Sequence, residues 1–253
     1  MGPVTAKEKN VKLDHFGLFS HNFYKSTFEL CRETGLGNYD SGFFPNFGNA
    51  AKNVALGPDV YLEIEGLVDY TVIKRIVESE AGASEPHVMA FIRKLLAKPE
   101  VFFLWAFRAE SLAELNEIAR VAGWAVDHDT LNQANAQQRM NGDNYPTVST
   151  PKGGEQFASS PGMPNVYLYP HDPDRSKQDL RALVIPETSK KKPTGVAWLE
   201  VGGTEKQFED WFGGFAKARD FPLQFNGKAP GLYTLAVNTD GGEVVIRRPA
   251  INS

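Results

Sequence analysis

The sequence has little of several features that mark large classes of proteins. Among 253 residues it contains one cysteine, Cys31, which rules out an intrachain disulfide and is typical of a reducing compartment. No apolar run approaches the roughly 20 residues of a membrane span, and residues 1–10 lack the apolar core of a signal peptide. The net charge is −4 and there is no basic block, which argues against nucleic acid. We therefore expect a soluble, cytoplasmic protein with neither nucleic acid nor membrane as a partner.

Common active-site motifs are absent as well. The chain has no Gly-x-Ser-x-Gly elbow, no phosphate-binding loop, no Gly-x-Gly-x-x-Gly and no His-Glu-x-x-His. Cys31 recurs at helical spacing with Tyr24 and Phe28, so it is interpreted as a packing residue rather than a nucleophile. The sequence offers no support for a serine hydrolase, a nucleotide-dependent enzyme or a zincin protease.

Two similar strand segments, about a hundred residues apart, stand out in what remains. They read Val60-Tyr61-Leu62-Glu63-Ile64-Glu65 and Val166-Tyr167-Leu168-Tyr169-Pro170-His171. Alternation in a strand places Tyr61, Glu63 and Glu65 on one face, and Tyr167, Tyr169 and His171 on the matching face of the second copy. A strand that is apolar on one side and polar on the other either lines a wet cavity or is an ordinary half-solvated strand.

The pattern of strands and helices predicts one β-α-β-β-β unit that occurs three times. Residues 1–10 form a tail, 11–185 hold two units with a helical insertion at 67–99, 186–194 are a solvated linker, and 195–253 form the third unit. The region 40–53 is rich in Gly, Asn and Pro and precedes a short strand candidate at 54–56. Helices are expected at 70–80 and 86–97 of the insertion, which either packs on the core or acts as a lid.

The predicted fold class is α+β, with tandem units forming cupped mixed β-sheets and helices outside. The polar strand residues would then face the inside of the cup. An odd number of units leaves one sheet half without a partner in the same chain. We therefore expect a homodimer, formed through residues 195–249.

The segments Leu13-Asp14-His15-Phe16-Gly17-Leu18 and Gly57…Val60-Tyr61-Leu62-Glu63-Ile64 resemble the vicinal-oxygen-chelate superfamily, in its divergent glyoxalase-like domain branch. They are similar to that branch's opening Leu-Asp-His and closing Tyr-Leu-Glu-Leu. The resemblance implies metal ligands at a first-strand His and a fourth-strand Glu, which here are His15 and Glu63. It also implies a bound divalent ion (Fe, Mn, Zn or Ni). Because the chain departs from the family pattern, the alternative is a protein that binds no metal.

The departures lie in the second unit. Its first strand, 101–108, has neither His nor Gln where a ligand is expected. Tyr169 matches Glu63, and His171 matches Glu65 and is the candidate for a third ligand. The proposed metal set is therefore His15, Glu63 and His171.

The resemblance implies a glyoxalase-like enzyme that acts on a small oxygenated molecule, aromatic or carbonyl. It would be a metal-assisted lyase or isomerase, or a ring-cleaving dioxygenase. Glu63 and Tyr169 are the candidate catalytic residues, and Tyr61, Tyr167 and Arg139 the candidate substrate-binding residues. A non-catalytic protein that binds or sequesters a small molecule in the same cup is the alternative.

Overall fold

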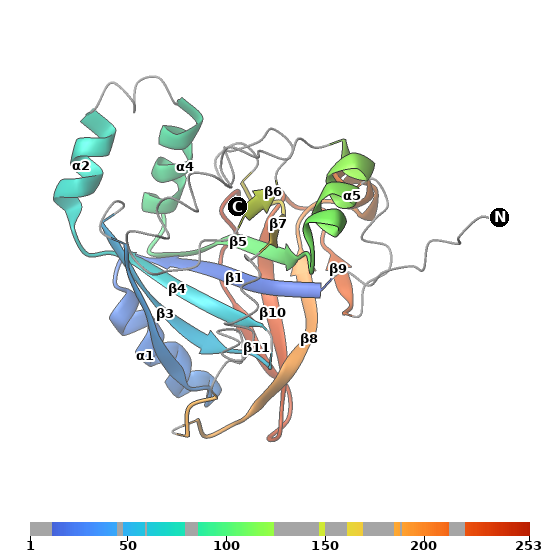
Figure 1. Ribbon diagram of the computed structural model, residues 1–253. Coiled ribbons are helices and arrows are strands. Elements are labelled where there is room, and N and C mark those ends of the chain that lie inside the picture. Colours follow the sequence, from blue (N-terminus) through green and yellow to red (C-terminus); the bar gives the residue numbers. More distant parts are fainter. Residues whose placement is uncertain are drawn as a thin grey trace.

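Two mixed β-sheets, one of seven strands and one of four, form the framework of the molecule (Figure 1). The structure is a computed structural model and describes residues 12–44, 48–58, 60–78, 86–123, 147–149, 161–168, 185–187, 189–212 and 221–253. The sheets and their helices confirm the predicted α+β class. No helix in these ranges is long and apolar enough to cross a membrane.

The first unit is complete. It consists of β1 (Lys12–Ser20), α1 (Phe23–Thr34), β2 (Asn38–Phe44), β3 (Asn49–Ala55) and β4 (Tyr61–Leu67). The side chain of Asn22 caps α1 by accepting a hydrogen bond from the Lys25 N–H, and α1 ends at Gly35, whose φ of 79° suits glycine. β4 runs parallel to β1 and antiparallel to β3, and β3 is antiparallel to β2.

The region 40–53, rich in Gly, Asn and Pro, contributes to two strands. β2 and β3 form an antiparallel pair there, with Tyr39 opposite Asn53. Pairing with β4 stabilises β3, although the residues of this region have weak strand propensity.

The second unit lies against the first across β1. It comprises β5 (Glu100–Arg108), α5 (Leu112–Ala122), β6 (Thr147–Ser149) and β7 (Asn165–Leu168). Ser111 caps α5 and Gly123 ends it with φ 70°, as the capping pattern predicts. β5 is antiparallel to β1, so the strand order is β2-β3-β4-β1-β5-β7-β6 and two units share one sheet. The strand expected at 124–128 lies outside the described residues.

The C-terminal part forms the second sheet. Its elements are β8 (Pro193–Val201), α8 (Glu205–Phe212), β9 (Leu223–Phe225), β10 (Leu232–Thr239) and β11 (Val244–Arg247). They follow the β-α-β-β-β order along the chain, but the strand order is β11-β10-β8-β9, with β8 parallel to β9. In the first unit the first strand pairs instead with the last strand, β4. A third copy of the unit is thus supported in element order but not in pairing.

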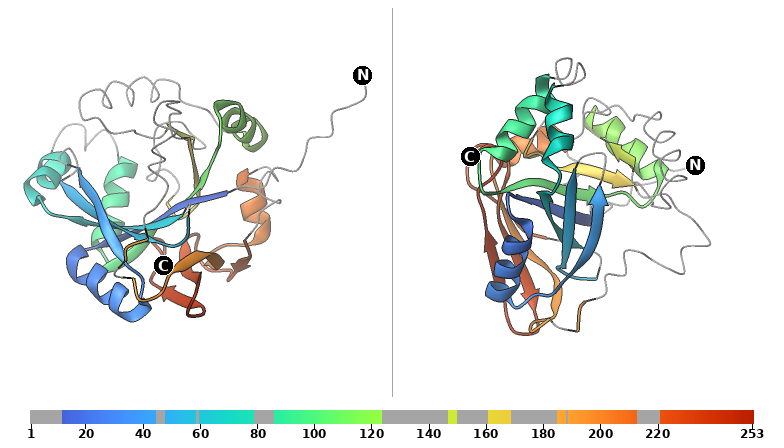
Figure 2. Two further views of the ribbon diagram at one scale, coloured as in Figure 1. Left: turned by 60° about the horizontal axis from the view of Figure 1, so that its bottom comes forward. Right: turned by 90° about the vertical axis from the view of Figure 1, so that its left-hand side faces the viewer.

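This second sheet packs on the seven-stranded sheet, on the same side as α1 (Figure 2). The shared core contains Phe16, Leu18, Leu62 and Ile64 from one sheet, and Leu199, Val201, Leu235 and Val237 from the other. The face that we expected to need a second chain is therefore covered within the chain. A homodimer through residues 195–249 stays a prediction, but the reason given for it, a sheet half without a partner in the same chain, no longer applies.

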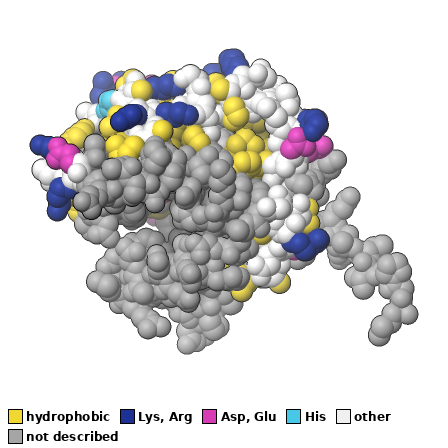
Figure 3. Space-filling model, turned by 90° about the horizontal axis from the view of Figure 1, so that it is seen from above, with side chains coloured by type: hydrophobic (Ala, Val, Ile, Leu, Met, Phe, Trp, Pro, Cys, Tyr) yellow, Lys and Arg dark blue, Asp and Glu magenta, His cyan; other side chains and the backbone are white. Residues whose placement is uncertain are grey.

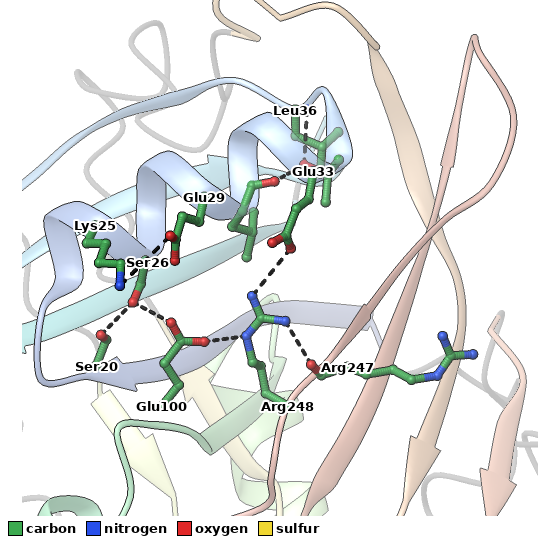
Figure 4. Close-up of polar contacts among 11 residues, drawn as sticks. Ser20, Lys25, Ser26, Glu29, Glu33, Leu36, Glu100, Arg247 and Arg248 are labelled. Atoms are coloured by element: carbon green, nitrogen blue, oxygen red, sulfur yellow. Dashed lines mark hydrogen bonds and ion pairs between the residues drawn. The ribbon is translucent and has the colours of Figure 1, made fainter.

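An ion-pair network joins the C-terminal segment to both α1 and β5 (Figure 4). Arg248 Nε donates a hydrogen bond to Glu100 Oε2, and Arg248 Nη2 lies 3.8 Å from Glu33 Oε2. Ser26 Oγ of α1 donates to the other oxygen of Glu100. The network ties three segments that are distant in sequence.

The insertion contains α2 (Tyr70–Glu78) and α4 (Pro86–Leu96), close to the predicted ranges. The rings of Phe91 in α4 and Phe103 in β5 lie 6.2 Å apart, and after α4 Lys98 Nζ donates a hydrogen bond to the carbonyl of Ala250 at 2.7 Å. Of the two alternatives, packing on the core and acting as a lid, these contacts support packing on the core for α4. Figure 3 shows the molecule from above. On the described part of the surface seen there, hydrophobic side chains lie among Lys and Arg side chains, as is common on protein surfaces.

Candidate functional site

One face of the seven-stranded sheet carries the polar residues that the sequence singled out. In β4 the buried side chains of Leu62 and Ile64 point into the shared core, so Tyr61, Glu63 and Glu65 point to the opposite face. His15 of β1 lies directly opposite Tyr61, and its ring contacts that of Tyr167 from β7. We call this side of the sheet the cup face. It brings together His15, Tyr61, Glu63 and Tyr167 of the predicted site residues.

A β-bulge places Asp14 on the cup face beside His15. Leu13 pairs with Phe107 and Phe16 pairs with Trp105, so Asp14 and His15 together oppose the single residue between them on β5. Regular alternation would send Asp14 into the core. The extra residue turns both side chains to one side of the sheet, which is how bulges re-aim side chains next to active sites.

The Asp14–His15 pair is the most buried polar feature of the cup face. His15 Nδ1 lies 2.5 Å from Asp14 Oδ2, and the two residues are 4% and 2% exposed. Tyr61 stacks on the imidazole at 5.2 Å and Tyr167 meets it edge-on at 4.7 Å. The carboxylate holds the ring through Nδ1, so Nε2 is the nitrogen that can serve as a ligand or exchange a proton.

Two carboxyl groups follow on β4. Ser41 Oγ donates to Glu63 Oε1 at 2.9 Å, and Asn49 Nδ2 donates to Glu65 Oε2 at 2.6 Å. Burial, with the charge of Glu63, raises the pKa of Glu65 to about 8 against the opposing effect of its hydrogen bond from Asn49. At neutral pH one residue of the pair is therefore a protonated carboxylic acid.

Both tyrosines near the acidic groups are held in the neutral form. Burial raises the pKa of Tyr167 well above its ordinary value, and the nearby Asp14 and Tyr61 add to the shift. Burial likewise raises the pKa of Tyr39 to about 12, and the charge of Glu63 contributes. Neutral phenols of this kind can orient a substrate oxygen or donate a hydrogen bond to it.

Glycine at position 17 shapes the floor of the cup face between His15 and Glu63. A second bulge, between the Gly17–Leu104 and Leu18–Phe102 pairs, leaves Phe103 as the extra residue on β5. A Cβ atom at Gly17 would lie 2.7 Å from two ring carbons of Phe103. The absence of a side chain at Gly17 thus lets the Phe103 ring lie against the strand that carries the candidate ligands.

The register also assigns a second-unit counterpart to His15. Tyr61 pairs with His15 in the first unit, and Tyr167, which matches Tyr61 in sequence, pairs with Arg108 in the second. The sequence analysis found no ligand in β5 and overlooked Arg108. The position of Arg108 relative to Tyr167 depends on the register between β5 and β7, which the sequence does not give. Ser41 was missed for a similar reason, while Asp14 was visible in the Leu-Asp-His motif but carried no assigned role.

The fit to a divalent metal ion is good for two of the three proposed ligands. His15 has the carboxylate-oriented imidazole that is typical of metal-binding histidines, and Glu63 is a half-buried carboxylate held by Ser41. The third, His171, lies outside the described residues, as do Tyr169 and Arg139. Within the described ranges no group of three or more His, Cys, Asp or Glu residues is placed to hold a metal.

Among the solved structures to which this chain is similar, one with a TM-score above 0.5 supports the fold. A hypothetical protein from Staphylococcus aureus is similar to this chain with a TM-score of 0.54 and 9% identity, over 88% of each chain. A catechol 2,3-dioxygenase matches at 0.48 and 10% identity, over 96% of this chain and 90% of the other. A methylmalonyl-CoA epimerase from Mycobacterium tuberculosis matches at 0.40 and 10% identity, over 69% of this chain and 97% of the other.

No curated protein matches the chain. The family comparison is more direct, because the sequence profile of the glyoxalase-like domain matches residues 13–149, a little over half of the chain. The matched segment begins at β1, which carries Asp14 and His15, and includes β4 with Glu63. The chain belongs to the glyoxalase-like domain family.

Proposed function

We propose that the chain is a glyoxalase-like enzyme of the lyase or isomerase type, which moves a proton on a small oxygenated carbonyl or aromatic molecule bound at the cup face. The observation that carries this proposal is the buried Asp14–His15 pair, joined at 2.5 Å between two tyrosine rings. An ionisable pair in such a setting is costly to desolvate, and core packing alone gives no reason for it. Pairs of this kind are concentrated at functional sites.

The described residues have distinct roles in this proposal. Asp14 orients the imidazole of His15, and Ser41 holds Oε1 of Glu63, which leaves Oε2 to take up the proton. Tyr61 and Tyr167 enclose the imidazole and provide ring surfaces for the substrate. His15, Glu63 and His171 are the proposed holders of a divalent metal ion, which when bound supplies Lewis-acid activation of the substrate oxygens. Tyr169 is proposed as the proton donor.

Proton transfer can be followed without knowing the physiological substrate. In D2O, small 2-oxo and 2-hydroxy carbonyl compounds are incubated with the metal-reconstituted protein, and deuterium at the carbon next to the carbonyl is measured by NMR. We expect incorporation that falls by about 10²–10⁴-fold in Glu63→Gln. His21→Ala, which changes an exposed histidine, serves as the control and should retain the wild-type rate. No incorporation with any compound would contradict a lyase or isomerase.

The same metal ligands would serve a ring-cleaving dioxygenase. The identity of the bound metal distinguishes this enzyme from a lyase or isomerase. Elemental analysis of protein purified without chelators, together with oxygen consumption on catechols, separates the two reactions. Iron with oxygen uptake indicates the dioxygenase.

A non-catalytic binding protein is the second candidate. The observation that favours it is Arg108, which stands where a second-unit ligand would be expected from the position of His15. Less than about a tenth of an equivalent of transition metal, no binding on reconstitution and no deuterium incorporation would together select this function.

A further inference from the structure

Arg108, at the end of β5, is a buried arginine whose hydrogen-bonding capacity is largely unused. The residue is 7% exposed. Among the described residues it makes one side-chain hydrogen bond, from Nε to Glu110 Oε1 at 3.2 Å. A guanidinium group has five N–H donors and cannot lose its charge, so burial with one neighbouring carboxylate leaves most donors available.

The position of Arg108 relates it to the cup face. It pairs with Tyr167 on the parallel strand β7, and paired residues on neighbouring strands point to the same side of a sheet. Tyr167 in turn lies with its ring 4.7 Å from that of His15. Arg108 thus lies on the cup face beside Tyr167, whose ring contacts that of His15.

Arg108 shares its one neighbouring carboxylate, that of Glu110, with a second cation. Lys12 Nζ lies 3.3 Å from Glu110 Oε1, the same oxygen that Arg108 Nε contacts at 3.2 Å. Burial acts to raise the pKa of Glu110, but Arg108 and Lys12 outweigh it and hold that pKa below its ordinary value. One carboxylate thus serves two cations, of which Lys12 is half-exposed to solvent and Arg108 is not.

We infer that Arg108 binds a carboxylate group of the ligand, so that the cup face takes a small carboxylic acid with its reactive carbonyl or ring directed toward His15. The planar fork of a guanidinium matches a carboxylate with two parallel hydrogen bonds. A carboxylate can accept hydrogen bonds from the guanidinium donors that Glu110 leaves open. The inference rests on the proposed function for its choice of site and deepens it by naming the substrate class.

Benzoate and its neutral counterpart benzamide test the inference by isothermal titration calorimetry on the full chain. They share a ring suited to Tyr61 and Tyr167 and differ in the anionic group. We expect wild type to bind benzoate at least about tenfold more tightly than benzamide, the difference typical of a charge-assisted hydrogen bond. Arg108→Gln should remove this preference, and Lys12→Gln, the control that shares Glu110, should change benzoate affinity by less than about twofold.

A second variant, Glu110→Gln, tests the inference even if Arg108→Gln fails to fold. It leaves Arg108 in place and removes the carboxylate charge that competes with the ligand, so benzoate should bind more tightly than to wild type. Equal affinity for benzoate and benzamide in wild type, or an unchanged preference in a folded Arg108→Gln, would overturn the inference, as would weaker benzoate binding in Glu110→Gln.

The result can be separated from that of the proposed function. His15→Ala should keep the preference for benzoate, because the anion contact does not involve His15. A retained preference without deuterium incorporation from any carbonyl compound would support the carboxylate site and reject the enzyme. Incorporation without a preference for benzoate would reject the carboxylate site alone.

Discussion

Asp14 and His15 are neighbours in sequence that share one face of a strand, with Oδ2 and Nδ1 2.5 Å apart. In a regular strand neighbouring side chains point to opposite faces, so this contact exists only because β1 is bulged at these residues. The bulge places a carboxylate behind the imidazole and determines which nitrogen of His15 faces the ligand.

Asp14→Asn should impair the site while preserving the fold. The amide keeps the size of the carboxylate but not its charge, so the imidazole is held less well. We expect metal affinity or turnover to fall by about 10–100-fold, the range found when a group that supports a ligand is altered. Asp40→Asn is the control, because that side chain is 88% exposed. Equal activity of Asp14→Asn and wild type would show that the pair is structural.

Single and double substitution of His15 and Glu63 tests whether they act on one ion. We expect His15→Ala and Glu63→Ala each to lose most of the bound metal, and the double variant to lose little more, since groups that act as a unit are not additive. Metal content by elemental analysis and melting temperature are the measurements. Stability without metal should fall by at most about 1–3 kcal/mol. Full metal occupancy in His15→Ala would refute the ligand assignment.

Glu65 should make stability depend on pH in a defined direction. Its pKa is raised from 4.5 to about 8 in the folded protein, so the folded state binds more protons than the unfolded state between these values. The free energy of unfolding should therefore fall as pH rises from about 4.5 to about 8 and level off above. At about 1.4 kcal/mol per pKa unit, the loss is on the order of a few kcal/mol.

Urea unfolding in buffer with a chelator, at pH 5, 6.5 and 9, measures this dependence for Glu65. Glu65→Gln keeps an oxygen that can accept the Asn49 hydrogen bond but cannot ionise, so its stability should fall less between pH 5 and 9 than that of wild type. Parallel pH profiles for the two proteins would contradict the shift.

Gly17→Ala should destabilise the protein through a steric clash. The new Cβ would lie 2.7 Å from ring carbons of Phe103 and 2.9 Å from Leu104 Cβ, and overpacking of this kind typically costs about 1–3 kcal/mol. Gly42→Ala is the matched control, since a Cβ there meets nothing within 4 Å. Adding Phe103→Leu to Gly17→Ala should restore part of the loss in urea unfolding. Equal effects of Gly17→Ala and Gly42→Ala would contradict the clash.

Glu100→Gln should weaken the junction of α1, β5 and the C-terminal segment. The side chains of Glu100 and Arg248 are 24% and 19% exposed, so loss of the charge leaves a partly buried guanidinium with a weaker partner. We expect a decrease of about 1–2 kcal/mol in the free energy of unfolding. Glu117→Gln, in an exposed pair with Arg120, should change it much less, because solvent screens exposed ion pairs. A smaller effect at Glu100 than at Glu117 would refute this role.

Local features were predictable from sequence because they depend on a few adjacent residues. Alternation placed Tyr61, Glu63 and Glu65 on one face, and the structure keeps them there. The cap at Ser111 and the left-handed Gly123 mark both ends of α5 as predicted. The motif around His15 was sufficient to identify the family.

Tertiary pairing decided what no local pattern contains. The antiparallel pair of β2 and β3 is stabilised because β3 also pairs with β4, although the region 40–53 is rich in Gly, Asn and Pro. The C-terminal strands pack on the same chain, because their apolar face fits the core beside α1 rather than a second subunit.

By itself, then, the sequence determined the α+β class, the faces of regular strands and the family, because alternation, helix caps and short motifs are properties of neighbouring residues. Only the tertiary structure decided that Asp14 turns toward His15 and that Arg108 takes the place of His15 in the second unit. Both depend on the register between strands that are distant in the chain, and a one-residue shift in register reverses the face to which a side chain points.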